Sequence, residues 1–287
     1  MRLQEPVNKP APKEASTFGV AGRLGFRRWT EDGVESDSRA FPEEVPIAMV
    51  VNDDNYAVML GSPADLTDFA YGFLHTEGVI RDVAEVDSVD TFVRPEGQVV
   101  QVRLLGAMPA QMRRERRIAG VSSCGLCGVE SLREAVRPIA RVPDGPVLDG
   151  VAITRAMAQL GDNQPYNAVT GAMHVAAFAE AGGDLLRARE DVGRHNALDK
   201  LIGALMRDGI TPESGFMVTS SRCSYELVQK AAAFGVRLLC TISAPTALAV
   251  RLARQANISL VSLVRGDSFI VLAGSERIEG TEALTDG

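Results

Sequence analysis

The chain has 287 residues, of which 46% are hydrophobic and 23% are charged, and its formal net charge at pH 7 is −7. This length allows one large hydrophobic core or two smaller ones, as in a globular protein. The acidic balance argues against general nucleic-acid binding, because neutralising phosphates needs a basic excess.

The sequence has no apolar run close to the roughly 18 residues that cross a membrane, and its start lacks the apolar core of a secretory signal. We therefore expect a cytoplasmic protein with no membrane partner. In that compartment, the four cysteines suggest metal or thiol chemistry instead of a disulfide framework. Residues 1–17 are rich in Pro, Lys and Glu and are expected to form a disordered tail.

Two antiparallel hairpins are predicted in the first third of the chain. Residues 45–52 and 55–61 are β-rich and are separated by Asp53 and Asp54, which tolerate the backbone angles of a tight turn. Residues 86–105 alternate around the turn sequence PEG and predict the second hairpin.

A helix is predicted between these hairpins. Ser62 is a good N-cap, Pro63 fits the first helical position, and Gly78 is suited to end the element. Its apolar face is expected to consist of Leu66, Phe69, Ala70, Phe73 and Leu74.

Strands alternate with helices in the second half of the chain. The expected elements are a hairpin over 174–190, helices over 192–209, 224–235 and 245–257, single strands over 216–221 and 237–243, and two strands over 258–274. This order predicts an α/β fold, with helices packed on a sheet. We expect a β-rich N-terminal part over 18–150, ending in the cysteine loop, and an α/β domain over 151–287.

The stretch VSSCGLCGVE contains Cys124 and Cys127, each followed by glycine. A C-x-x-C pair supplies half of a structural zinc site, but Cys223 and Cys240 stand alone on other predicted elements. A thioredoxin-like redox pair would follow the first strand of its sheet, whereas this pair follows two hairpins. A thiolate that carries sulfur as a persulfide is a third possibility, because the nearby arginines of residues 113–117 would favour it. These arginines could equally form a solvated helix face.

A zinc deaminase is a further alternative, because such enzymes place H-x-E before P-C-x-x-C. His75 and Glu77 form an H-x-E here, but Ser123 replaces the proline, and His75 is expected to be a packed residue at a helix end. We therefore predict no metal site.

Two predicted helix entrances are suited to binding anions, although neither standard nucleotide loop is present. Gly193, Arg194 and His195 lie at the first, and Ser221 and Arg222 lie at the second. Both follow extended segments, where ligands of open α/β sheets usually bind. His195 by itself is better explained as a satisfied, partly buried imidazole, whereas the cluster taken together favours a ligand site.

Four separated motifs resemble the FdhD family of formate dehydrogenase accessory sulfurtransferases, and the resemblance runs from about residue 20 to residue 280. The motifs are SSCGLCG at 122–128, REDVGRHNALDKLIG at 189–203, SSRCSYELVQKAA at 220–232 and SAPTALAV at 243–250.

This resemblance implies a sulfurtransferase that takes persulfide sulfur from a cysteine desulfurase and passes it to a molybdenum bis(molybdopterin guanine dinucleotide) cofactor, as formate dehydrogenase activity requires. It implies a cytidine-deaminase-like α/β domain, a homodimer, Cys124 as the persulfide carrier and Cys127 as its partner. A guanine nucleotide is expected to substitute for the cofactor. The implied cofactor contacts near the C-terminus are Leu263, Val264, Arg265, Gly266, Asp267 and Ser268. The alternative is a non-catalytic chaperone that binds the same cofactor.

Two departures from the family pattern affect individual ligand assignments. Cys223 follows Arg222 and adds a thiol near the expected pocket, and Arg265 would have to supply the positive charge of the C-terminal loop.

Overall fold

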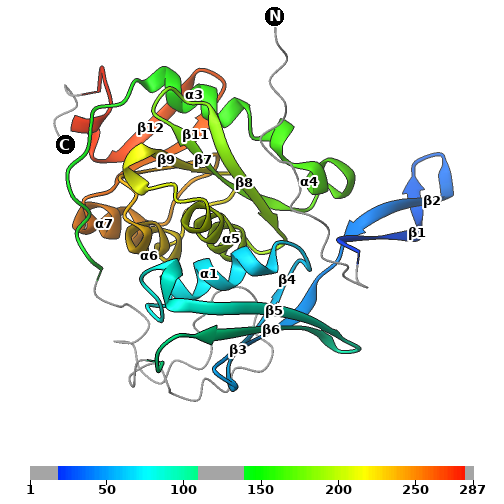
Figure 1. Ribbon diagram of the computed structural model, residues 1–287. Helices are drawn as coiled ribbons and strands as arrows, with labels where there is room; N and C mark the ends of the chain where they lie inside the picture. The colour runs from blue at the N-terminus through cyan, green and yellow to red at the C-terminus, as the bar shows by residue number, and fades with distance from the viewer. Residues whose placement is uncertain (1–18, 109–138, 282–287) are drawn as a thin grey trace, which may run out of the picture.

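The computed structural model describes residues 19–108 and 139–281, and the domain boundary expected near residue 150 stays a prediction. Two helices, α1 and α5, lie between a four-stranded sheet and a six-stranded sheet (Figure 1). The α/β class and the smaller β-containing N-terminal part are therefore confirmed. Among the described residues, no helix is long and apolar enough to cross a membrane.

The four-stranded sheet contains both predicted hairpins, in the order β4-β3-β6-β5. Its strands are β3 (Val45–Val51), β4 (Asp54–Gly61), β5 (Val86–Arg94) and β6 (Gly97–Leu104). The first turn is one residue earlier than predicted, because Asn52 and Asp53 take the two left-handed positions that a two-residue hairpin loop needs.

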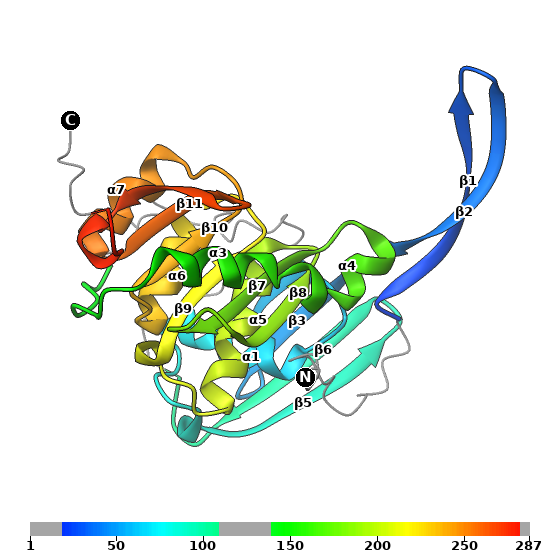
Figure 2. The ribbon, with the colours of Figure 1, turned by 90° about the horizontal axis from the view of Figure 1, so that it is seen from above.

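The structure contains a further hairpin that was not predicted from the sequence. β1 (Ala21–Thr30) and β2 (Gly33–Pro42) form a separate two-stranded sheet that projects from the body (Figure 2). Most of its side chains are exposed, including Trp29 at 75%. The hairpin therefore lacks the alternation of buried and exposed residues by which a strand is recognised.

The helix α1 (Leu66–Thr76) begins later than predicted, with Asp65 as its N-cap. Ser62 is fully buried and caps no helix, because its backbone and side chain bond to residues at the end of β8. The predicted apolar face is confirmed, and it packs on the four-stranded sheet.

The six-stranded sheet has the order β12-β11-β10-β9-β7-β8. Its strands are β7 (His174–Glu180), β8 (Leu185–Asp191), β9 (Gly215–Thr219), β10 (Leu238–Thr241), β11 (Ser259–Arg265) and β12 (Ser268–Ala273). The helices α5 (Arg194–Arg207), α6 (Tyr225–Phe234) and α7 (Ala247–Ala256) contribute to the apolar cluster on one face. The helix α3 (Gly150–Ala158) packs on the other face. Every strand and helix predicted in this half is present.

The short helix α4 (Pro165–Thr170) is held by the end of β8. Both carboxylate oxygens of Glu190 accept hydrogen bonds from its first turn, at 2.9 Å from the Tyr166 N–H and 2.8 Å from the Asn167 N–H. These contacts satisfy two amides that would otherwise lack a partner at the helix start.

Two glycines bring α1 and α5 into backbone contact. A Cβ added to Gly72 would lie 1.8 Å from the Asp199 carbonyl oxygen, and one added to Gly203 would lie 1.8 Å from the Asp68 carbonyl oxygen. Any larger side chain would force the helices apart, so these glycines set the spacing of the two layers.

Replacing Gly203 with alanine should therefore destabilise the protein. We expect Gly203→Ala to lower the free energy of unfolding by about 1–3 kcal/mol, as overpacking does, despite the better helix propensity of alanine. Gly161→Ala is the matched control, because its added Cβ meets nothing within 4 Å. Urea unfolding measures both, and equal stabilities of the two variants would contradict the close contact.

Candidate functional site at the carboxyl edge of the parallel strands

Four strands of the large sheet end at one edge. β9, β10 and β11 are mutually parallel, and β8 runs the same way because both β8 and β9 are antiparallel to β7. Arg194 follows β8, Arg222 follows β9, and the predicted contact loop from Leu263 to Ser268 closes β11. The structure thus places all the described residues of the predicted site at the edge where ligands of α/β sheets bind.

A buried ion pair organises the first helix entrance. Asp191 and Lys200 are both fully buried, and their charged atoms lie 2.7 Å apart. The other interactions of Asp191 are with the N–H groups of Ser62 at 2.9 Å and Gly193 at 2.7 Å, and with the Asn196 amide at 3.1 Å. At this entrance, which we predicted to be suited to anions, the Gly193 N–H is therefore directed at Asp191.

At the second entrance α6 begins at Tyr225 with Ser224 as its N-cap, as the helix predicted over 224–235 requires, so Ser221 lies three residues before the cap. Ser221 is buried, and its hydroxyl donates to the Arg222 carbonyl oxygen at 3.1 Å. His195 joins the two entrances, since its Nε2 lies 2.7 Å from a Glu226 carboxylate oxygen and 3.2 Å from the Ser224 hydroxyl. The roles of Ser221 and His195 as ligands stay predictions, but both side chains have partners within the protein.

Positive charge gathers between the two entrances. Arg194 and Arg222 both act on the ring of His174, whose pKa is lowered chiefly by burial and next by the Arg194 charge. Neither arginine pairs with an acidic side chain among residues 19–108 and 139–281, and the buried Nε of Arg194 has no hydrogen-bond partner there. This combination favours an anionic ligand.

The third predicted element is a strained turn. Leu263 has a left-handed backbone with φ 55°, and Gly266 turns the chain with φ 58°. The register between β11 and β12 shifts at this point, which marks a bulge. Such strain in a residue other than glycine is typical of functional loops. Arg265 is exposed here, but four strand spacings, or about 19 Å, separate β11 from β8. Arg265 and Arg194 therefore could reach only different parts of one large ligand.

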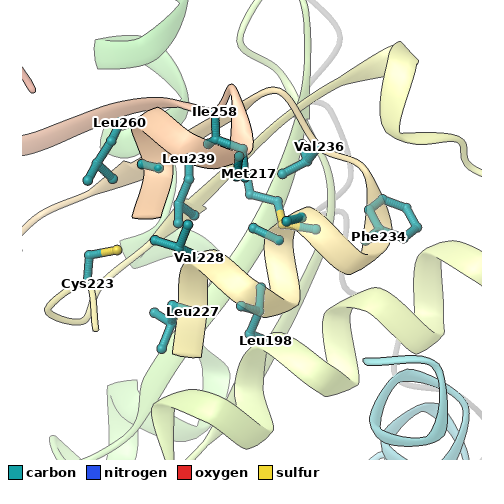
Figure 3. Packing of buried hydrophobic residues seen from close by; sticks show 14 of the residues in the cluster. Leu198, Met217, Cys223, Leu227, Val228, Phe234, Val236, Leu239, Ile258 and Leu260 are labelled. Carbon is teal, nitrogen blue, oxygen red and sulfur yellow. The ribbon is translucent and has the colours of Figure 1, made fainter. Parts of the chain in front are cut away.

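Cys223 and Cys240 belong to the hydrophobic core. Cys223 lies among buried residues such as Leu227 and Val228 (Figure 3). Burial raises the pKa of its thiol to about 12. Burial also raises the pKa of Cys240 well above its usual value. Both stay protonated near neutral pH and are poor nucleophiles. The other two cysteines, Cys124 and Cys127, lie outside the described residues.

His75, the histidine of the deaminase alternative, has a structural role. His75 contacts the Phe234 ring, and its Nε2 lies 3.0 Å from the Ala233 carbonyl oxygen, so it joins α1 to α6. Among the described residues, no group of three His, Cys, Asp or Glu side chains is arranged to hold a metal ion.

Comparison with known proteins agrees with the motifs found in the sequence. The model of the FdhD/NarQ family matches residues 42–279. The chain belongs to the FdhD/NarQ family. A curated relative from Bordetella bronchiseptica, named sulfur carrier protein FdhD, is 47% identical over 237 residues, covering 82% of this chain and 86% of that protein. One of the same name from Cupriavidus necator is 42% identical over 291 aligned residues and covers 98% of each chain.

The fold is also that of a solved structure. The crystal structure described as a formate dehydrogenase accessory protein from Desulfotalea psychrophila matches with a TM-score of 0.71 and 23% identity, covering 91% of this chain and all of that one. At this identity the match shows the shared fold. The family predicted from the motifs is therefore confirmed.

Three residues of this edge were missed in the sequence. They are Ser62, His174 and Glu226. Glu226 pairs with His195, and the charges of Arg194 and Arg222 act on His174. Ser62 accepts a hydrogen bond from the Val192 N–H, beside Gly193. His174 is one of only three histidines in the chain, which is the one signal that could have drawn attention to it.

Breaking the buried ion pair should destabilise this FdhD/NarQ family member. We expect Lys200→Met to cost about 3–5 kcal/mol, because Asp191 would stay buried without its cationic partner. Arg155→Met is the control, since the Arg155–Asp184 pair is half exposed and should cost less than about 1 kcal/mol. Equal urea midpoints for the two variants would refute the organising role of the pair.

The core cysteines should be unreactive in the native protein. In a variant with both Cys124→Ser and Cys127→Ser, we expect Ellman's reagent at about pH 8 to label almost no thiol until the protein is unfolded, because protonated buried thiols are poor nucleophiles. Rapid labelling of the folded variant would show that Cys223 or Cys240 is accessible.

Proposed function

We propose that this chain is a sulfur carrier for formate dehydrogenase maturation, with Cys124 as the carrying thiol. The observation that carries the proposal is its 47% identity to a sulfur carrier protein FdhD across most of both chains. The state of the other cysteines supports it, because burial and raised pKa values make Cys223 and Cys240 unsuitable for sulfur chemistry. Sulfur transfer is therefore assigned to the C-x-x-C motif.

The first step is a thiol exchange with a cysteine desulfurase. The Cys124 thiolate attacks the terminal sulfur of the desulfurase persulfide, the sulfur–sulfur bond breaks, and the desulfurase thiolate leaves. Cys124 then holds the extra sulfur as its own persulfide. For release, the Cys127 thiol attacks the Cys124 sulfur, which frees the outer sulfur as hydrosulfide and leaves a Cys124–Cys127 disulfide. The two thiols thus supply the two electrons that sulfide formation needs.

The acceptor in this proposal is a molybdenum bis(molybdopterin guanine dinucleotide) cofactor, bound as substrate at the carboxyl edge of the parallel strands. Arg194 and Arg222 would bind phosphate oxygens at the β8–β9 end of this edge. The β11–β12 loop with Arg265 would contact a distant part, because it lies about 19 Å from β8. A ligand with two dinucleotide arms suits such a spread of contacts. We further propose that the chain works as a homodimer.

A cysteine variant tests sulfur transfer. We expect Cys124→Ala to gain no cyanolysable sulfur when it is incubated with a cysteine desulfurase and cysteine, and to restore less than about one hundredth of the formate dehydrogenase activity in cells lacking the natural protein. Cys223→Ala is the matched control and should retain both activities, since Cys223 is a core residue.

The same assays separate the carrier from a chaperone that only binds the cofactor. If Cys124→Ala restored full formate dehydrogenase activity and the unaltered protein gained no cyanolysable sulfur, the carrier proposal would be wrong. A cofactor-binding chaperone would then be the better explanation.

A further inference from the structure

The position of His174 follows from the strand registers. It is the first residue of β7 and lies opposite Asp191 in the β7–β8 pair. On the other side, Ala176 pairs with Thr219 of β9, so His174 lies level with the loop that leads to α6. His174 therefore lies between the two helix entrances of the candidate site.

The side chain of His174 points to the face where these helices begin. Residues two apart on a strand share a face, and Ala176 and Phe178 belong to the apolar cluster that contains α5 and α6. His174 is only partly buried, so its ring lines this edge and does not lie wholly within the core.

The charges that act on His174 are mostly positive. Among the described residues, Arg194 and His195 act on it from α5, Arg222 acts on it from the loop before α6, and Asp191 is the acidic group nearby. Asp191 is already neutralised by the fully buried Lys200.

Glu226 is the second acidic residue of this region, and it also has a partner. The Glu226 carboxylate is paired with His195 at 2.7 Å. Within the part of the chain that the structure describes, the two arginines thus face His174 with no carboxylate of their own. A proton on the empty ring would add a further cation to this group and is disfavoured.

We propose that His174 is a ligand-binding residue of this edge, neutral when the site is empty, and that it takes up a proton to donate a hydrogen bond to a phosphate oxygen when a polyanionic ligand binds. This inference rests on the proposed function, because it assumes that the edge binds the phosphates of a nucleotide-containing ligand. A bound phosphate would supply the negative charge that is missing, and an imidazolium donates a stronger hydrogen bond to it than a neutral ring does.

The sign of the pH effect follows from linkage. The ligand raises the pKa of His174 from a value below its usual one of 6.5. Between the pKa of the free site and that of the complex, binding takes up a proton, so affinity rises as the pH falls. The gain is at most about tenfold per pH unit for one proton, and it ends below the pKa of the free site.

Guanosine 5′-diphosphate is a suitable probe, and isothermal titration calorimetry between about pH 5.5 and pH 8 measures both its affinity and the protons exchanged. We expect the natural chain to show more proton uptake and a steeper affinity gain toward low pH than His174→Asn. Protonation of the nucleotide itself contributes equally to both proteins. His75→Gln is the matched control, because His75 contacts Ala233 and Phe234 away from this edge, and it should retain the full slope.

The outcomes separate this inference from the proposed function. If His174→Asn bound the nucleotide with the same proton uptake and slope as the natural chain, the role of His174 would be refuted while nucleotide binding stood. If the natural chain bound no nucleotide at any pH, both would be refuted. Should the variant not fold, NMR titration of the histidine rings in the natural chain decides, since a His174 pKa that the nucleotide leaves unchanged overturns the inference.

Discussion

The buried pair of Asp191 and Lys200 is the interaction on which the rest of this structure depends. Desolvating two charges is costly, and here each charge is compensated by its partner and by further hydrogen bonds. Lys200 also donates to the Ser62 carbonyl oxygen at 3.0 Å, and Asp191 accepts from the Ser62 N–H. One ion pair thus fixes the end of β8, the start of α5 and the segment that leaves the four-stranded sheet. The candidate site is built on the junction of the two sheets.

This arrangement explains why Arg194 and Arg222, at the carboxyl edge of the parallel strands, keep positive charges that the described acidic side chains do not neutralise. The acids near it are directed inward, Asp191 toward Lys200 and Glu226 toward His195. Among the described residues Arg194 and Arg222 have no acidic partner, which is why we propose them as contacts of an anionic ligand. The protein has a net negative charge, so the positive charge of this edge is a local property that composition does not reveal.

Local patterns in the sequence predicted the strands of both sheets and the helices of the second half in their order along the chain, because strand alternation, helix periodicity and turn residues act over short distances. The order of the strands within each sheet was not predicted. The cysteine motif, the segments around Arg194 and Arg222, and the stretch at 243–250 together were sufficient to predict the family. What could not be predicted depends on distant contacts. Ser62 has the features of a helix cap in the sequence, yet its partner Asp191 is 129 residues away. The importance of His174 depends on Arg194 and Arg222, which belong to two other elements and cannot be placed near it from the sequence. The β1–β2 hairpin could not be predicted because its strands lack an alternation of buried and exposed residues.

The last two residues of β8 serve opposite faces of the large sheet. Glu190 holds the first turn of α4 on one face, while Asp191 holds the entrance of α5 on the other. Side chains alternate along a strand, so a slip of β8 by one residue would exchange the two carboxylates between the faces. Asp191 would then leave Lys200 without its counter-ion, and the amides of α4 would lose their acceptor. The backbone hydrogen bonds between β8 and β7 could form equally well after such a slip. The register of β8, which is an edge strand, is therefore specified by polar contacts on both faces of the sheet.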